Sequence, residues 1–206
     1  MTTEQERWNE TWSRLGAVAP EALLAELVAR YSEPHRFYHT LQHLRECFFV
    51  LEPASHLARR LAEVQLALWF HDAVYDTRAQ DNEEESAHWA EQSLLAGGAG
   101  LDAAARVRKL VLTTKHNAVP EEEDAKLLVD VDLSILGAAE SRFAEYERQI
   151  RQEYGWVPED LFRQGRARLL ASLLNRSSIY STAWFASRLE EQARKNLSRS
   201  LEELVV

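Results

Sequence analysis

Two pairs of polar residues combine the side-chain types that bind divalent metal ions. His39 and His43 are four residues apart, so both project from one face if their segment is helical. His71 and Asp72 are adjacent and follow an apolar run. Consecutive side chains meet at one ion only where the backbone departs from a regular helix, as at a helix end. The pairs indicate a metal site, and the alternative is that His39 and His43 are accommodated separately on a helix surface.

A third segment offers another carboxylate. Asp130 and Asp132 are two residues apart, and on an ideal helix their side chains point about 200° apart. Only one of them is therefore expected to reach the ion. Two imidazoles and two carboxylates form a mixed nitrogen and oxygen shell, which suits manganese, iron, cobalt, nickel or zinc, with magnesium also a candidate.

Length and composition predict one folded domain over residues 1–206, because the chain is long enough for a single substantial core. The hydrophobic fraction of 46% is typical of globular proteins. The net charge of -9 argues against broad nucleic-acid binding and against binding to an anionic membrane, since both need a basic face.

The termini and the cysteine content favour a cytoplasmic location. The first seven residues are polar and acidic, unlike a signal peptide, and no run of about 18 apolar residues occurs, so neither export nor membrane insertion is expected. Cys47 is the single cysteine, which excludes an intrachain disulfide. Its place in an apolar helical segment predicts a core residue rather than a reactive thiol.

The fold class is predicted to be all-α, because apolar residues recur at three- and four-residue spacing, and we expect about eight to ten helices in one bundle. After an N-terminal helix, the expected helices cover residues 20–30, 38–51, 56–72, 81–97, 101–114, 124–136, 139–154, 159–175 and 181–203. The helix at 56–72 is so apolar that burial on all sides is expected, and Pro53 should belong to its cap. The acidic run 121–124 is expected to be a solvated first turn.

The order of the polar residues resembles the HD superfamily of metal-dependent phosphohydrolases, whose ligands come as His, His-Asp and Asp on separate helices. The corresponding positions in this chain are His43, His71, Asp72 and Asp132. Residues 38–43, Tyr-His-Thr-Leu-Gln-His, are similar to the Tyr-His-Asn-x-x-His segment of cyclic-nucleotide phosphodiesterases. The resemblance implies His43 as a metal ligand and His39 as a general acid.

Two further segments carry the resemblance. Residues 71–77 are similar to the His-Asp-x-x-Glu-Asp-Thr motif of the bacterial ppGpp synthetase/hydrolase proteins, although Tyr75 replaces the glutamate. Residues 131–133 match their Ala-Asp-Arg-Leu segment, which favours Asp132 over Asp130. The pattern over residues 34–137 is also similar to the small stand-alone bacterial group of HD phosphohydrolases. It implies a motif core there, with the N- and C-terminal helices packed around it.

Substrate contacts are assigned from chemistry and position. Arg36 and Lys115 are expected to contact phosphate, and the planar fork of arginine suits that role. Tyr38 is expected to stack on a nucleobase. His116 has three interpretations: a ligand of a second metal ion, a phosphate contact, or a histidine favoured by a helix dipole.

Proton transfer and orientation are assigned to three residues. His39 would donate a proton to the leaving oxygen, since imidazole titrates near neutral pH. Asp76 would act as a base or orient the attacking water. Glu83 would accept a hydrogen bond that orients a ligand histidine.

The resemblance implies a hydrolase that uses a divalent ion to lower the pKa of bound water from near 16 toward about 7. Its expected substrate is a phosphate ester or anhydride of a small, nucleotide-like metabolite. One alternative is an HD-fold di-iron oxygenase, although His88 and His116 are the only histidines between Asp72 and Asp132. The other is a catalytically silent helical module that binds a ligand or partner. A homodimer is a further expectation.

Overall fold

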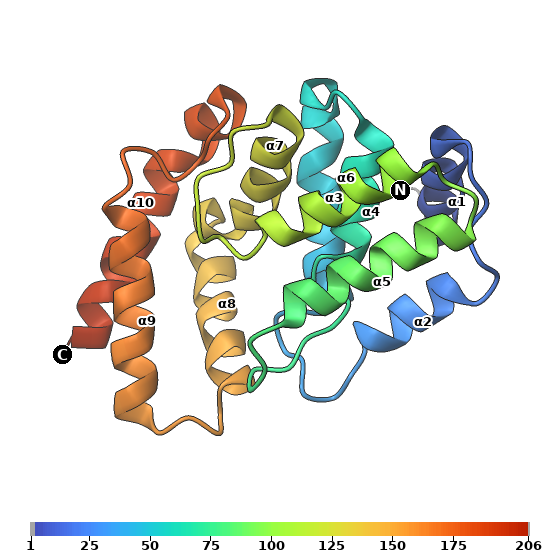
Figure 1. Cartoon of the computed structure of the whole chain (residues 1–206). Helices are drawn as coiled ribbons and strands as arrows, with labels where there is room; N and C mark the ends of the chain where they lie inside the picture. The colour runs from blue at the N-terminus through green and yellow to red at the C-terminus, as the bar shows by residue number, and fades with distance from the viewer. Residues whose placement is uncertain (1–2, 206) are drawn as a thin grey trace. The chain divides into compact units, whose positions relative to one another are not determined.

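Every regular element among the described residues is a helix, so the all-α prediction is confirmed. The computed structural model describes residues 3–205, with side chains through residue 204. This range holds ten α-helices and two short 3-10 helices (Figure 1). They are α1 Glu4–Leu15, α2 Leu23–Arg30, α3 Leu41–Ala54, η1 Ser55–Leu57, α4 Leu61–Phe70, α5 Asn82–Ala96, α6 Leu101–Thr113, α7 Glu123–Asp132, η2 Leu133–Gly137, α8 Glu140–Glu153, α9 Glu159–Leu174 and α10 Ala183–Val205.

Two predicted boundaries around α3 are wrong. The helix begins at Leu41 rather than near Tyr38, because the Thr40 side chain caps it by accepting a hydrogen bond from the backbone of Gln42 at 3.2 Å. At the other end, Pro53 lies inside the last turn of α3 instead of capping the next helix. A proline removes only one backbone donor, and the helix ends one residue later.

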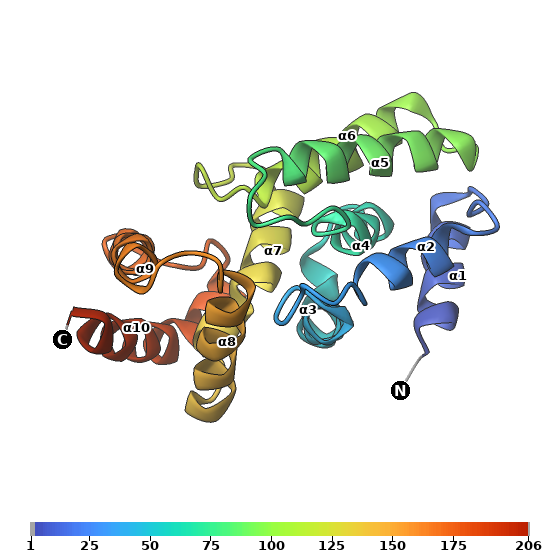
Figure 2. The same cartoon turned by 90° about the horizontal axis from the view of Figure 1, so that it is seen from below.

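The chain forms two compact units, and the boundary between Val129 and Asp130 falls within α7. In the first unit α4 is central. It packs against α1 and α3 on one side and against α5 and α6 on the other (Figure 2). The predicted burial of this helix is confirmed, since seven of its ten residues are buried: Glu63, Val64, Leu66, Ala67, Leu68, Trp69 and Phe70. The prediction that residues 1–206 form one domain stays a prediction.

The start of α4 is fixed by an acidic residue from a distant segment. The carboxylate of Asp124 accepts hydrogen bonds from the backbone N–H groups of Arg59 and Arg60, at 2.7 and 3.2 Å. Asp124 is only 9% exposed. The expectation that the whole run 121–124 is solvated is therefore wrong at this position, because its last carboxylate satisfies donors at a helix N-terminus.

The second unit is built on α10, which packs against α9 and η2. Asn196 of α10 is buried and donates to the carbonyl oxygens of Leu136 and Ala138, both at 2.8 Å. Asp130 accepts hydrogen bonds from the backbone of Ser181 and Thr182, both at 2.7 Å, just before α10 begins. Its burial raises the pKa of Asp130 above the ordinary value.

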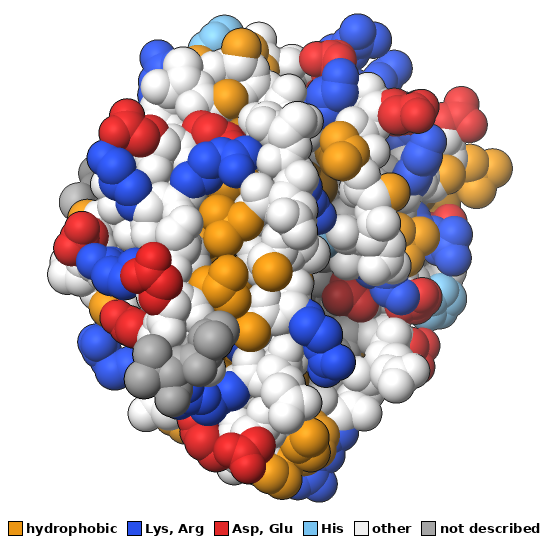
Figure 3. Space-filling model, turned by 90° about the vertical axis from the view of Figure 1, so that its left-hand side faces the viewer, with side chains coloured by type: hydrophobic (Ala, Val, Ile, Leu, Met, Phe, Trp, Pro, Cys, Tyr) orange, Lys and Arg blue, Asp and Glu red, His pale blue; other side chains and the backbone are white. Residues whose placement is uncertain are grey.

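The outward face of α9 and α10 carries both acidic and basic side chains, with apolar side chains in a band between them (Figure 3). Within residues 3–205, none of the helices is long and apolar enough to cross a membrane.

The central position of α4 can be tested with Leu66, which is completely buried. Replacing it with alanine leaves a cavity, so we expect the Leu66→Ala variant to lose about 3 kcal/mol of unfolding free energy in urea denaturation. The matched control is Leu101→Ala, because Leu101 is 76% exposed. The control should lose less than about 0.5 kcal/mol. Equal losses would contradict the central role of α4.

Candidate metal centre

Three ligand atoms converge at the end of α4. His43 Nε2 lies 3.1 Å from His71 Nε2, and Asp72 Oδ2 lies 3.0 Å from His71 Nε2 and 3.6 Å from His43 Nε2. Ligands that share one zinc-like ion are about 3.0 to 3.4 Å apart, given metal–ligand bonds of about 2.0 to 2.1 Å. The spacing therefore fits a common metal ion, and His43 and His71 also belong to a group of buried side chains that could hold one.

The orientation of His71 is set by its second ring nitrogen. Nδ1 lies 2.6 Å from the carbonyl oxygen of Leu68, and because a carbonyl only accepts, Nδ1 carries the proton. In the neutral ring the lone pair is then on Nε2, which faces His43 and Asp72. A hydrogen bond of this kind typically holds metal-binding histidines in the required tautomer.

The surroundings of the Asp72 carboxylate favour a bound cation. Its Oδ2 is buried and accepts no well-formed hydrogen bond from the described residues. Burial by itself would raise the pKa of this carboxyl, but the positive charges that the rings of His71, His39 and His43 carry when protonated outweigh it and hold the pKa well below its usual range. The carboxylate and the lone pair on His71 repel each other unless a proton or a metal ion lies between them. The residues present therefore fit a divalent ion.

Tyr31 holds the backbone that carries this pair, a role that the sequence did not indicate. Its hydroxyl donates to the carbonyl of Trp69 at 3.2 Å and accepts from the N–H of Asp72 at 3.4 Å. The ring is fully buried, and that burial, together with the Asp72 carboxylate, raises the pKa of the phenol well above its ordinary value. The hydroxyl thus remains protonated and continues to bridge the end of α4 to the loop that follows.

Arg36 supports the same loop, and its predicted phosphate contact stays a prediction. The side chain is fully buried. Its guanidinium donates to the carbonyl oxygens of Asp72 at 2.6 Å and Ala73 at 3.1 Å, and to Glu33 at 3.0 Å. It also reaches the carbonyl of His39 at 3.3 Å. All three nitrogens donate to protein groups, so Arg36 is a positioning residue.

Cys47 lies beside the ligands, as the sequence analysis did not foresee. The prediction of a buried residue is confirmed, since it is 1% exposed. However, its sulfur lies 3.7 Å from both ring nitrogens of His43, one helical turn earlier on α3. The ligand atoms of His43, Cys47 and His71 all lie within 4.8 Å of one another. The four-residue spacing of His43 and Cys47 was the available signal.

Aromatic rings surround the histidines on the side of the loop before α3. The ring of His39 stacks on Tyr75 with a centroid distance of 4.2 Å and lies 6.0 Å from the ring of His43. Tyr38 is 4% exposed, and its ring lies 4.6 Å from that of His43. Tyr38 therefore packs against the ring of His43, a candidate ligand. Its predicted contact with a nucleobase stays a prediction.

Of the predicted acidic and basic partners, Asp76 and Lys115 bind other groups of the protein. Asp76 is exposed, and its carboxylate accepts from the backbone of Arg78 at 2.9 Å, which stabilises the turn. Lys115 forms an ion pair with Glu84, and that hydrogen bond raises the pKa of the lysine. Glu83 lies half-buried in the first turn of α5. Their predicted roles in catalysis and substrate binding stay predictions.

Two other predicted ligands also stay predictions. His116 follows α6 and has a left-handed backbone conformation, with φ of 54°. Asp132 is the last residue of α7. Its neighbour Asp130 accepts hydrogen bonds with both carboxylate oxygens from the backbone of the two residues that precede α10. That structural role agrees with the choice of Asp132 rather than Asp130 as the candidate ligand.

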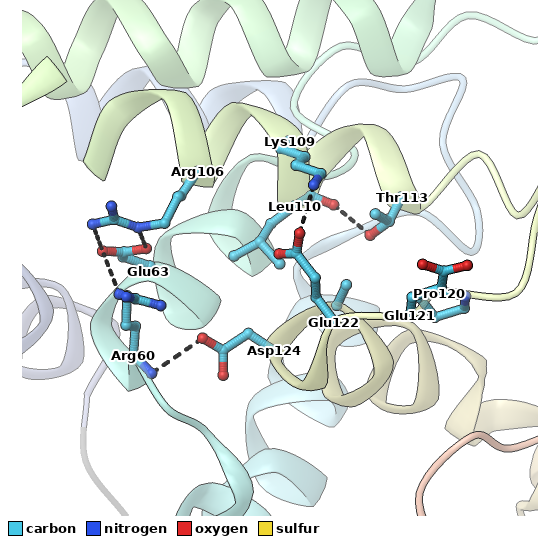
Figure 4. Close-up of a pocket in the computed structure, with 11 residues that line it drawn as sticks. Arg60, Glu63, Arg106, Lys109, Leu110, Thr113, Pro120, Glu121, Glu122 and Asp124 are labelled. Carbon is cyan, nitrogen blue, oxygen red and sulfur yellow. Dashed lines mark hydrogen bonds and ion pairs between the residues drawn. The ribbon is translucent and has the colours of Figure 1, made fainter. Parts of the chain in front are cut away.

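A pocket of about 250 Å³ lies elsewhere in the first unit, and none of the predicted site residues lines it (Figure 4). Its most prominent charges are paired. Arg106 donates to Glu63 at 2.7 and 2.8 Å, and Lys109 donates to Glu122 at 2.6 Å. The pocket is thus separate from the candidate metal centre.

No protein-family model, curated protein or solved structure matched the chain. The resemblance to the HD superfamily accordingly rests on the residues of the chain itself. The structure adds a helical fold in which His43 and His71 belong to a group of side chains that could hold a metal ion, with Asp72 Oδ2 3.0 Å from His71 Nε2.

The positioning role of Arg36 predicts a stability effect. Replacing it with methionine keeps most of the volume but leaves the carbonyls of Asp72 and Ala73 without a donor, so we expect a loss of about 2 to 4 kcal/mol of unfolding free energy. Arg30→Met is the control, because Arg30 is 54% exposed and shares only the Glu33 contact. A loss no greater than that of the control, measured by urea denaturation, would contradict the role.

Proposed function

We propose that this protein is a divalent-metal-dependent phosphohydrolase that cleaves a phosphate ester or anhydride of a small, nucleotide-like metabolite. The observation that supports it most strongly is the convergence of His43 Nε2, His71 Nε2 and Asp72 Oδ2 within 3.0 to 3.6 Å. These atoms belong to the residues that, by resemblance, hold the metal in the HD superfamily. Asp132 is the remaining ligand of that pattern.

Each ligand side chain has a defined task in this proposal. His43 presents Nε2 from a regular helix, and His71 presents Nε2 while its Nδ1–H donates a hydrogen bond to the Leu68 carbonyl. Asp72 contributes the negative charge that balances a cation. A divalent ion bound here would lower the pKa of a water ligand and polarise a phosphoryl oxygen.

His39 is the proposed proton donor for the leaving oxygen. It lies outside α3, is partly exposed, and stacks on Tyr75 rather than pointing into the core. A ring at this position is close to the ligand histidines while it remains accessible to a substrate. Imidazole suits the role because its pKa lies near neutral pH.

Asp72→Asn tests the metal centre and the activity together. The variant keeps the shape of the side chain but removes the charge, so we expect metal affinity to fall by at least about 10-fold. Hydrolysis of an aryl phosphate ester and of a nucleotide panel should fall with it. The measurements are metal content by mass spectrometry after reconstitution with manganese, cobalt or zinc, and phosphate release.

Asp81→Asn is the matched control, because Asp81 is an exposed carboxylate in the loop that follows the pair. It should bind metal and release phosphate like the unmodified protein. Metal binding without any phosphate release across the panel would reject the hydrolase proposal. Oxygen consumption with a mixed-valent iron signal in paramagnetic resonance would instead support the oxygenase alternative.

A further inference from the structure

We propose that Cys47 is a sulfur ligand of the candidate metal centre, and that it makes the centre selective for zinc, cobalt or ferrous iron over manganese and magnesium. This inference rests on the metal site of the proposed function. It adds a ligand that the pattern of histidines and aspartates does not contain, and it names the class of ion.

The distances around Cys47 support ligation. Its sulfur lies 3.7 Å from Nε2 of His43. A sulfur and a nitrogen that share one tetrahedral ion are about 3.6 Å apart, given bonds of about 2.3 and 2.05 Å. The ligand atoms of His43, Cys47 and His71 lie within 4.8 Å of one another, so a shift of no more than about 1.2 Å brings the sulfur into the shell.

Helix α3 sets the position of Cys47 relative to His43. Residues four apart on an α-helix lie on the same face, one turn from each other. His43 and Cys47 have this relationship on α3, and both are buried, at 2% and 1% exposure. The thiol therefore faces the imidazole in a space from which bulk water is excluded.

Sulfur changes which metal ion the centre prefers. Thiolates are soft ligands that favour zinc, cobalt and iron, whereas magnesium and manganese favour oxygen ligands. On binding, the S–H proton leaves to solvent and a metal–sulfur bond forms. The thiolate and the Asp72 carboxylate would then together carry two negative charges, which match the charge of a divalent ion.

The alternative is that Cys47 only packs against the His43 ring, and electronic absorption distinguishes the two cases. The apo protein, Cys47→Ser and Cys47→Ala are each titrated with Co²⁺. Ligation predicts an intense near-ultraviolet band from sulfur-to-cobalt charge transfer in the unmodified protein, which is absent from both variants. Zinc affinity should fall by at least about 10-fold in Cys47→Ala, while manganese affinity changes much less.

X-ray absorption at the zinc edge needs no variant, so it remains decisive if a substitution impairs folding. A sulfur neighbour at about 2.3 Å from zinc would support the proposal. A shell of nitrogen and oxygen alone would overturn it while leaving the proposed metal centre intact. If the unmodified protein binds neither cobalt nor zinc, the sulfur ligand is rejected, and if it does not bind manganese either, the metal centre is rejected with it.

Discussion

The candidate metal centre depends on the hydrogen bond between His71 Nδ1 and the carbonyl of Leu68. The bond closes within a single turn, so it requires only that α4 end where it does. A proton on Nδ1 leaves a lone pair on Nε2, and that lone pair faces the second histidine and the carboxylate. Without this bond the ring could rotate or change tautomer, and the three ligand atoms would no longer share a point.

The burial of α4 makes that local bond reliable. A helix with apolar residues on nearly every side is held by neighbours on each side, so its end cannot shift without disturbing the core. Tyr31 and Arg36 then fix the loop beyond it through backbone groups rather than side chains. The ligand carboxylate is thus positioned by packing and by a network of hydrogen bonds that are almost all to main-chain atoms.

Periodicity was sufficient to predict the helices, and the order of polar residues was sufficient to bring His43, His71 and Asp72 together. Neither signal was sufficient to predict the residues that support the site. Arg36 donates to main-chain carbonyls, which every residue has. No pattern of side-chain types in the sequence therefore predicts these contacts. Asp124 shows the same limit. In the sequence, an acidic residue in the first turn of its own helix looks the same as one that accepts hydrogen bonds at the start of another helix. Cys47 was correctly predicted to be buried, but its proximity to His43, one helical turn away, was not predicted.

The Thr40 cap divides the site into a rigid part and an adjustable part. His43 and Cys47 lie within a regular helix that begins at Leu41, whereas His39 belongs to the irregular segment before the cap. Substitutions at the exposed Phe37 or at His39 can alter what approaches the centre without moving the atoms that would hold an ion. Closely related chains could therefore keep the same metal ligands and still accept different molecules. A few substitutions in the segment before α3 would be enough.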